Sequence, residues 1–317
     1  MEVSARPGRT EEVRQPAVRM GLLSRSNKRR LGVATAYVIV GLWALFSVFP
    51  VFWTYFSSIK TSRDVFALPP KWIFTPTLDN YKVVLGLIVP TEQETVQEEY
   101  EGAVRSRLPD YILNTVIVSA SSALLTLVVG CPAAYALARS RMRGRRLILT
   151  GILVTQMIPP IVLLIPFYRI WRDAHLLDTR LGLTLAFFTL TLPFVIWMMR
   201  GFFQGVPVEL EEAAMIDGAS RWGALARVAL PLAAPGLATT AIFTVLFTWN
   251  EFLIASVLGG EQAKLLTPSI FGYVSDRSIL WGQLYAASSL VLLPVVAFTL
   301  LVQRHIVTGL TGGALKG

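Results

Sequence analysis

The chain has 317 residues, of which 54% are hydrophobic and only 15% charged, a composition that excludes an ordinary soluble globular domain. A formal net charge of +9 does not indicate nucleic-acid binding, because the basic residues cluster at the ends of apolar runs and form no continuous stripe. The single cysteine, Cys131, excludes an intrachain disulfide and a cysteine-based zinc cluster.

Six apolar runs, each long enough to cross a bilayer, predict an all-α polytopic membrane protein with six transmembrane helices. The predicted spans are 31–56, 111–138, 147–167, 181–200, 234–258 and 284–303. Residues 1–30 include eight Lys/Arg and are expected to form a mostly disordered cytoplasmic tail. The first apolar run is too long for the core of a signal peptide, so we expect it to remain as a span.

The distribution of basic residues predicts the side of the membrane on which each loop lies. With the N-terminus in the cytoplasm, 18 Lys/Arg lie inside and 11 outside, and the short loop Arg139–Arg146 alone has five arginines. The polar segment 201–233 and the C-terminal tail 304–317 are then cytoplasmic. The segment 57–110 is expected outside, where its acidic part, Thr91–Gly102, is interpreted as a solvated helix or a flexible insert.

The stretch Glu209–Pro231 interrupts the apolar runs and predicts a helix–turn–helix. Pro207 suits a first helical position, and the glutamates that follow lie where the positive end of the helix dipole favours carboxylates. Gly218 accepts the left-handed backbone that ends a helix, Ser220 can cap a second helix, and Pro231 prevents its simple continuation.

This helix–turn–helix offers a compact docking surface for a soluble partner. The small side chains of Ala213 and Ala214 would let the helix backbone approach a groove closely, and Glu212 could pair with a basic residue of the partner. The alternative interpretation is an amphipathic loop that rests on lipid headgroups.

Polar side chains within the predicted spans are candidates for a substrate path, because a charge at mid-bilayer costs on the order of 3 kcal/mol. Glu251 is the clearest case, with Asn250 and Trp249 beside it, and Tyr168 ends another span. The alternative for Asn250 and Glu251 is hydrogen bonding that holds neighbouring helices together. Tyr168 could equally be an interfacial anchor.

Catalytic patterns are absent from the sequence. It has no GxxxxGK[ST] phosphate-binding loop, and neither His175 nor His305 has partners at the spacing of metal ligands. The sequence therefore predicts no enzymatic activity, no cofactor and no metal site.

The order Glu212-Ala213-Ala214, three residues, Gly218, nine residues, Val228, one residue, Leu230-Pro231 resembles the EAA loop of ABC importer permeases. The resemblance also includes AAYALAR (Ala133–Arg139), MIPPIVLLIPFY (Met157–Tyr168), LPF (Leu192–Phe194), EEAAMIDGAS (Glu211–Ser220) and TWNEF (Thr248–Phe252). Together these motifs are similar to the second permease subunit of maltose/trehalose-type sugar importers.

This resemblance implies a type I importer permease in a bacterial inner membrane, paired with a second permease, two ATPase subunits and an extracytoplasmic sugar-binding protein. The residues that it assigns to ATPase coupling are Glu211, Glu212, Ala213, Ala214, Asp217, Gly218, Leu230 and Pro231. It implies that the loop Gly259–Gln283 enters the binding protein and that the tail Gly309–Gly317 reaches between the ATPases. An ion-coupled secondary transporter and a non-transport membrane scaffold are the alternatives.

Overall fold

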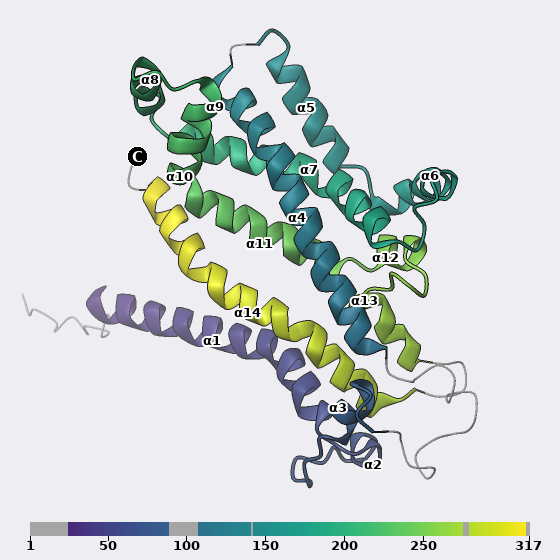
Figure 1. Cartoon of the computed structure of the whole chain (residues 1–317). Coiled ribbons are helices and arrows are strands. Elements are labelled where there is room, and N and C mark those ends of the chain that lie inside the picture. Colours follow the sequence, from purple (N-terminus) through teal and green to yellow (C-terminus); the bar gives the residue numbers. More distant parts are fainter. Residues whose placement is uncertain (1–24, 89–106, 141, 275–278, 315–317) are drawn as a thin grey trace, which may run out of the picture. The chain divides into compact units, whose positions relative to one another are not determined.

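The computed structural model describes residues 25–88, 107–140, 142–274 and 279–314 (Figure 1). The described chain is helical and has no β-strand, only an isolated bridge between Val274 and Ile279. It forms two compact units, residues 1–52 and 53–317, and the boundary falls within the first helix. The second unit contains every element discussed below except the N-terminal part of that helix.

The helices are α1 (Arg25–Ser58), α2 (Ser62–Val65), α3 (Asp79–Val84), α4 (Leu108–Arg139), α5 (Arg145–Gln156), α6 (Pro160–Asp173), α7 (Arg180–Gly205), α8 (Val208–Ile216), α9 (Arg221–Ala224), α10 (Leu230–Leu232), α11 (Ala234–Asn250), α12 (Leu253–Leu258), α13 (Leu266–Ser269) and α14 (Trp281–Ala314). A π-helix, η1 (Leu225–Ala229), joins α9 to α10, and a 3₁₀ helix, η2 (Ile270–Tyr273), follows α13.

Four of the predicted spans, 31–56, 111–138, 181–200 and 284–303, fall on the single long helices α1, α4, α7 and α14, each apolar and long enough to cross a membrane. The span predicted at 147–167 is instead two helices, α5 and α6, bent by 93°. Pro159 and Pro160 lie at this break, where a missing N–H and a fixed φ end one helix and begin the next.

The prediction of one continuous span over 234–258 is also wrong. The helix α11 ends at Asn250, and a separate short helix, α12, begins at Leu253. At its other end, α11 is bent by 80° from the segment Arg221–Leu232. With each bent pair counted as one span, the described chain has up to six spans.

Helices α4 and α7 pack along each other, and α11 packs against both (Figure 1). Small residues permit this close approach; a Cβ on Gly130 of α4 would lie only 2.8 Å from Val195 Cγ1 of α7. Hydroxyl pairs join α4 to α7, with 2.9 Å between Ser121 and Thr184. These helices therefore form the packed centre of the unit.

One face of α11 is a line of buried threonines, Thr240, Thr244 and Thr248. Each hydroxyl donates to the carbonyl four residues earlier in the same helix, at 2.8–3.2 Å. Only Thr248 also meets a hydroxyl of α4, that of Ser122, at 3.3 Å. The hydroxyl groups on this helix face therefore form their hydrogen bonds almost entirely within α11.

We expect Gly236→Ala to destabilise the protein by about 1–3 kcal/mol, because the added Cβ would overlap the ring of Phe202 where α11 meets α7. The thermal unfolding midpoint of the detergent-purified protein should fall by several degrees. Gly201→Ala is the matched control, since no atom other than its chain neighbours and the nearby backbone of its own helix lies within 4 Å of its Cβ position. Equal midpoints for the two variants would contradict this packing account.

The first part of the predicted external segment contains α2 and α3 and is organised around Lys60, which is only 2% exposed. Its ammonium donates to the carbonyl of Lys71 at 2.8 Å and lies 4.4–5.1 Å from the ring centres of Trp53, Phe56 and Phe74. Burial lowers the pKa of Lys60, an effect opposed by nearby Asp64. The acidic stretch 91–102 lies outside the described residues.

Candidate functional site

The polar stretch after α7 folds as a helix, a turn and a second helix, as the sequence predicts. Gly218 adopts φ +93° in the turn, and its N–H donates to the carbonyl of Met215. The Ser220 hydroxyl accepts the N–H of Gly223 at 3.1 Å and so caps α9. Pro207 lies one position before α8 and thus flanks the helix instead of opening it.

Glu211 anchors α8 to the C-terminal end of α4. Its carboxylate accepts hydrogen bonds from the hydroxyl of Tyr135 at 2.8 Å and from Arg139 Nε and Nη2 at 3.0 and 2.6 Å. The same Nη2 donates to the carbonyl of Val206, at the end of α7, at 2.8 Å. The side chain of Glu211 is 3% exposed and that of Arg139 16% exposed. One buried ion pair therefore ties α4, α7 and α8 together.

The other side of α8 faces outward. Glu212 and Ala213 are exposed and Ala214 is partly buried. Exposed large apolar side chains accompany them: Leu210, Met215, Ile216 and, from α9, Trp222. Such a patch suits binding either to a soluble partner or to lipid headgroups. We call α8 and α9 together the coupling loop.

The coupling loop continues into the π-helix η1, which sequence reasoning missed. Leu225 and Ala229 of η1 are buried in the core that α4 and α7 form. Pro231 cannot donate a backbone hydrogen bond, and the wider turn ends just before it, with the N–H of Leu230 donating to the carbonyl of Leu225. Asp217 and Pro231 are exposed, and Leu230 is partly buried.

The four candidate path residues occupy different environments. Trp249 is buried and its indole N–H donates to the carbonyl of Val291 at 3.1 Å, which places it in the core. Asn250 is exposed and its amide donates to the carbonyl of Leu246 at 2.8 Å. Tyr168, on α6, is 43% exposed. A role for these residues in a substrate path stays a prediction.

Glu251 lies at the break between α11 and α12 and not within a continuous span. Its carboxylate accepts the backbone N–H groups of Leu253, Ile254 and Ala255 at 2.9–3.1 Å. These are the unpaired donors at the start of α12, where the helix dipole favours a negative charge. This half-buried glutamate therefore caps a helix.

Within the described residues, no group of three or more His, Cys, Asp or Glu side chains is placed to hold a metal ion. The coupling loop, all of whose residues are described, contributes no such group. Its geometry supports a mechanical role, because an exposed apolar face lies on an element that is bonded to the long helices α4 and α7.

Comparison with known proteins agrees with this geometry. Residues 126–312 match the model of a family described as binding-protein-dependent transport system inner membrane component. The diacetylchitobiose uptake system permease protein DasC of Streptomyces coelicolor is 35% identical over 90% of this chain and 96% of its own. The trehalose transport system permease protein SugB of Mycobacterium tuberculosis is 35% identical over 83% of this chain and 98% of its own.

A solved structure shares the fold. It is a bacterial ABC transporter involved in the import of the acidic polysaccharide alginate, one chain of which is 26% identical to this one. The match covers 90% of this chain and 99% of that chain, with a TM-score of 0.66.

Proposed function

Because the chain belongs to the family of binding-protein-dependent transport system inner membrane components, we propose that it is a transmembrane permease subunit of an ATP-driven sugar importer. It forms half of the translocation path, and a second, different permease forms the other half. ATP is hydrolysed by separate ATPase subunits, and an extracytoplasmic binding protein delivers the sugar. Both termini and the coupling loop lie in the cytoplasm of a bacterial cell with the chain in its inner membrane.

The observation that carries this proposal is the two-sided construction of the coupling loop. Its inner side is fixed to α4 and α7 through Glu211 and Arg139, while its outer side exposes Glu212, Ala213 and apolar neighbours. A partner that binds the outer side can therefore move α4 and α7 through the ion pair between Glu211 and Arg139 and the hydrogen bond from Arg139 to Val206. We assign this partner as the ATPase subunit, whose nucleotide-driven motion would pass through the coupling loop to α4 and α7.

Carbohydrate as the substrate class is supported by the named relatives, which take up diacetylchitobiose and trehalose. The chain itself offers a suitable surface. Phe243, Phe247 and Asn250 are exposed on α11 at a spacing of four and three residues, which places them on one helix face. Aromatic rings and an amide without fixed charge suit a polyhydroxyl solute.

Transport into proteoliposomes tests this function. The chain, co-purified with its second permease and ATPase, should take up the sugar carried by its binding protein only when ATP is present. Uptake driven by an ion gradient without ATP would instead support a secondary transporter. An assembly that carries no sugar under either condition would support a membrane scaffold.

We expect Asn250→Ala to lower sugar uptake about fivefold without loss of assembly, because one solute hydrogen bond is worth about 1 kcal/mol. Thr299→Ala is the matched control, since Thr299 is also exposed and also bonds the carbonyl four residues earlier in its helix. Normal uptake by Asn250→Ala would favour a purely structural role for this amide.

A further inference from the structure

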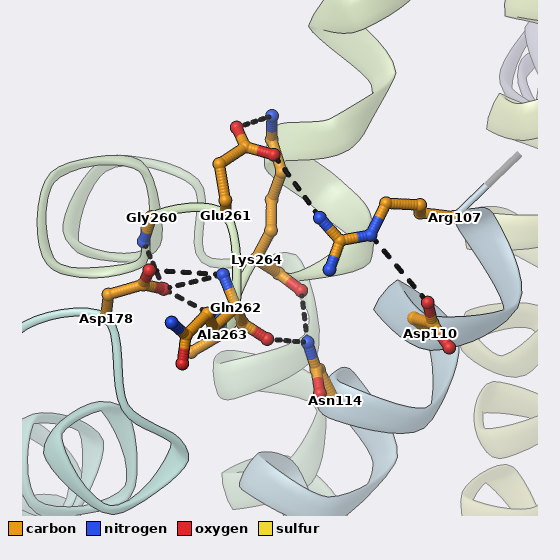
Figure 2. Close-up of polar contacts among 9 residues, drawn as sticks. All are labelled: Arg107, Asp110, Asn114, Asp178, Gly260, Glu261, Gln262, Ala263 and Lys264. Atoms are coloured by element: carbon orange, nitrogen blue, oxygen red, sulfur yellow. Dashed lines mark hydrogen bonds and ion pairs between the residues drawn. The ribbon is translucent and has the colours of Figure 1, made fainter. Parts of the chain in front are cut away.

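A single carboxylate holds the loop that follows α12. Asp178, in the turn between α6 and α7, has φ +54°, and its N–H donates to the carbonyl of Leu258 at 2.9 Å. Its carboxylate accepts the backbone N–H groups of Gly260, Gln262 and Ala263 at 2.8–3.1 Å (Figure 2). Charge-assisted bonds of this kind are about twice as strong as neutral ones. We call residues 259–265 the clamped loop.

A second side chain holds the carbonyls of the same loop. Asn114, near the start of α4 and only 1% exposed, donates its amide to the carbonyls of Gln262 and Lys264, both at 3.0 Å (Figure 2). Its own carbonyl oxygen accepts from Arg180 Nε, at the start of α7, at 2.7 Å. Backbone donors and acceptors of the clamped loop are thus satisfied by side chains of α4 and of the α6–α7 turn, which fix its shape.

The clamped loop has both exposed and buried side chains: Ala263 and Leu265, each 1% exposed, lie in the core beside α6 and α7, whereas two polar side chains are exposed. Glu261 is 73% exposed and lies 3.6 Å from both Arg107 and Lys264 (Figure 2), and Gln262 is exposed. Exposed ion pairs at such distances contribute only about 0–1 kcal/mol, so they do not hold the loop. The loop is held through its backbone bonds and through the burial of Ala263 and Leu265, so its exposed side chains, Glu261 and Gln262, have a fixed position.

The clamped loop lies at the opposite end of the long helices from the coupling loop. Asn114 is near the start of α4 and Arg139 at its end, and α7 runs from Arg180 to Gly205. At 1.5 Å per residue, the 26 residues of α7 span about 39 Å, more than the thickness of a bilayer core. With the coupling loop in the cytoplasm, the clamped loop faces the outside.

We propose that Asp178 is a positioning residue that fixes the clamped loop in the shape against which the extracytoplasmic binding protein docks. This inference rests on the proposed function. A loop that is already ordered loses little conformational freedom on binding, so the clamp strengthens docking of the binding protein. Asp178 acts through the backbone of the loop and does not itself touch the sugar.

The test replaces Asp178 by asparagine in the reconstituted transporter. The substitution keeps the size but puts an amide donor in place of one carboxylate oxygen, opposite backbone N–H groups. ATP hydrolysis is measured against the concentration of the purified, sugar-loaded binding protein. We expect the half-saturating concentration to rise about tenfold, equal to about 1.4 kcal/mol, with basal hydrolysis and the maximal rate unchanged.

The matched control is Asp173→Asn, at the end of α6, because Asp173 is 67% exposed and bonds only its neighbour Arg172 among the interactions described. It should leave the half-saturating concentration unchanged. An unchanged half-saturating concentration in Asp178→Asn would overturn the proposal. So would an equal fall in basal hydrolysis and assembly, which indicates a structural role alone.

Two further measurements separate positioning from other effects. Hydrogen exchange at the amides of Gly260, Gln262 and Ala263 should quicken in Asp178→Asn, and unchanged protection would overturn the clamp. Gln262→Ala removes an exposed side chain but keeps its backbone bond to Asp178. Gln262→Ala should raise the half-saturating concentration of the binding protein in the wild-type background but change it little in the Asp178→Asn background. Equal increases in both backgrounds would contradict action through the loop.

The outcomes also distinguish this inference from the proposed function. If the wild-type assembly imports sugar with ATP and the Asp178→Asn assembly binds the binding protein equally well, the inference alone is contradicted. An assembly that neither hydrolyses ATP nor imports sugar would contradict the proposed function.

Discussion

Replacement of Arg139 by glutamine is expected to destabilise the coupling loop by about 3–5 kcal/mol, because it leaves the carboxylate of Glu211 buried without its charged partner. The same change removes the bond from Arg139 to the carbonyl of Val206. With α8 no longer tied to α4 and α7, nucleotide-driven motion of the ATPase would not reach those helices. ATP-driven uptake should therefore fall below about 1% of its normal rate, since each 1.4 kcal/mol is a factor of ten.

Arg143→Gln is the control, because Arg143 lies in the same basic loop but is exposed. The double variant Arg139→Gln with Glu211→Gln removes both charges together, so it should be more stable than either single variant. The free energies of unfolding of the wild type, the two single variants at Arg139 and Glu211, and the double variant give the coupling energy between the two side chains. A coupling energy near zero would mean that this ion pair does not anchor the loop.

Glu212→Lys is expected to release the ATPase without affecting the fold of the chain. Glu212 is exposed on α8, so its replacement should change the free energy of unfolding by no more than about 0.5 kcal/mol. Reversal of a charge that pairs with a basic residue of the partner costs about 2–5 kcal/mol of docking energy. Co-purification from membranes should then recover less than a tenth of the usual ATPase.

Asp173→Lys makes the same charge change at the far end of the molecule and should leave ATPase recovery intact. Normal recovery with Glu212→Lys would refute the docking role of this face. Loss of the permease itself from the membrane would show that the substitution disturbs insertion and not docking.

Hydrophobic runs predicted the long helices well but could not show where an apolar run is broken. The segments on both sides of Glu251 are equally apolar, so a length criterion joins them into one span. The structure instead uses the carboxylate of Glu251 to start a new helix. A glutamate within an apolar run is compatible with either arrangement, and the choice depends on how α12 packs against α6 and α7.

Contacts between residues far apart in the chain explain what else the sequence could not predict. Glu211 and Glu212 are adjacent and chemically identical, yet one is bonded to Arg139 and the other is exposed. Nothing in the local pattern distinguishes them, because the partner of Glu211 lies 72 residues away. Likewise, Asp178 meets amides that are 82–85 positions later in the chain. Local signals, such as the turn at Gly218 and the cap at Ser220, were predictable because their partners are neighbours.

The line of threonines on α11 has a consequence for motion within the bundle. Because Thr240 and Thr244 bond only their own helix and Thr248 adds one weak contact with Ser122, a shift of α11 along α4 breaks few bonds between the helices. The buried face is polar in composition, yet only one of its three hydroxyls contacts a hydroxyl of α4. Contact between α11 and α4 therefore depends on the close packing of side chains more than on hydrogen bonds.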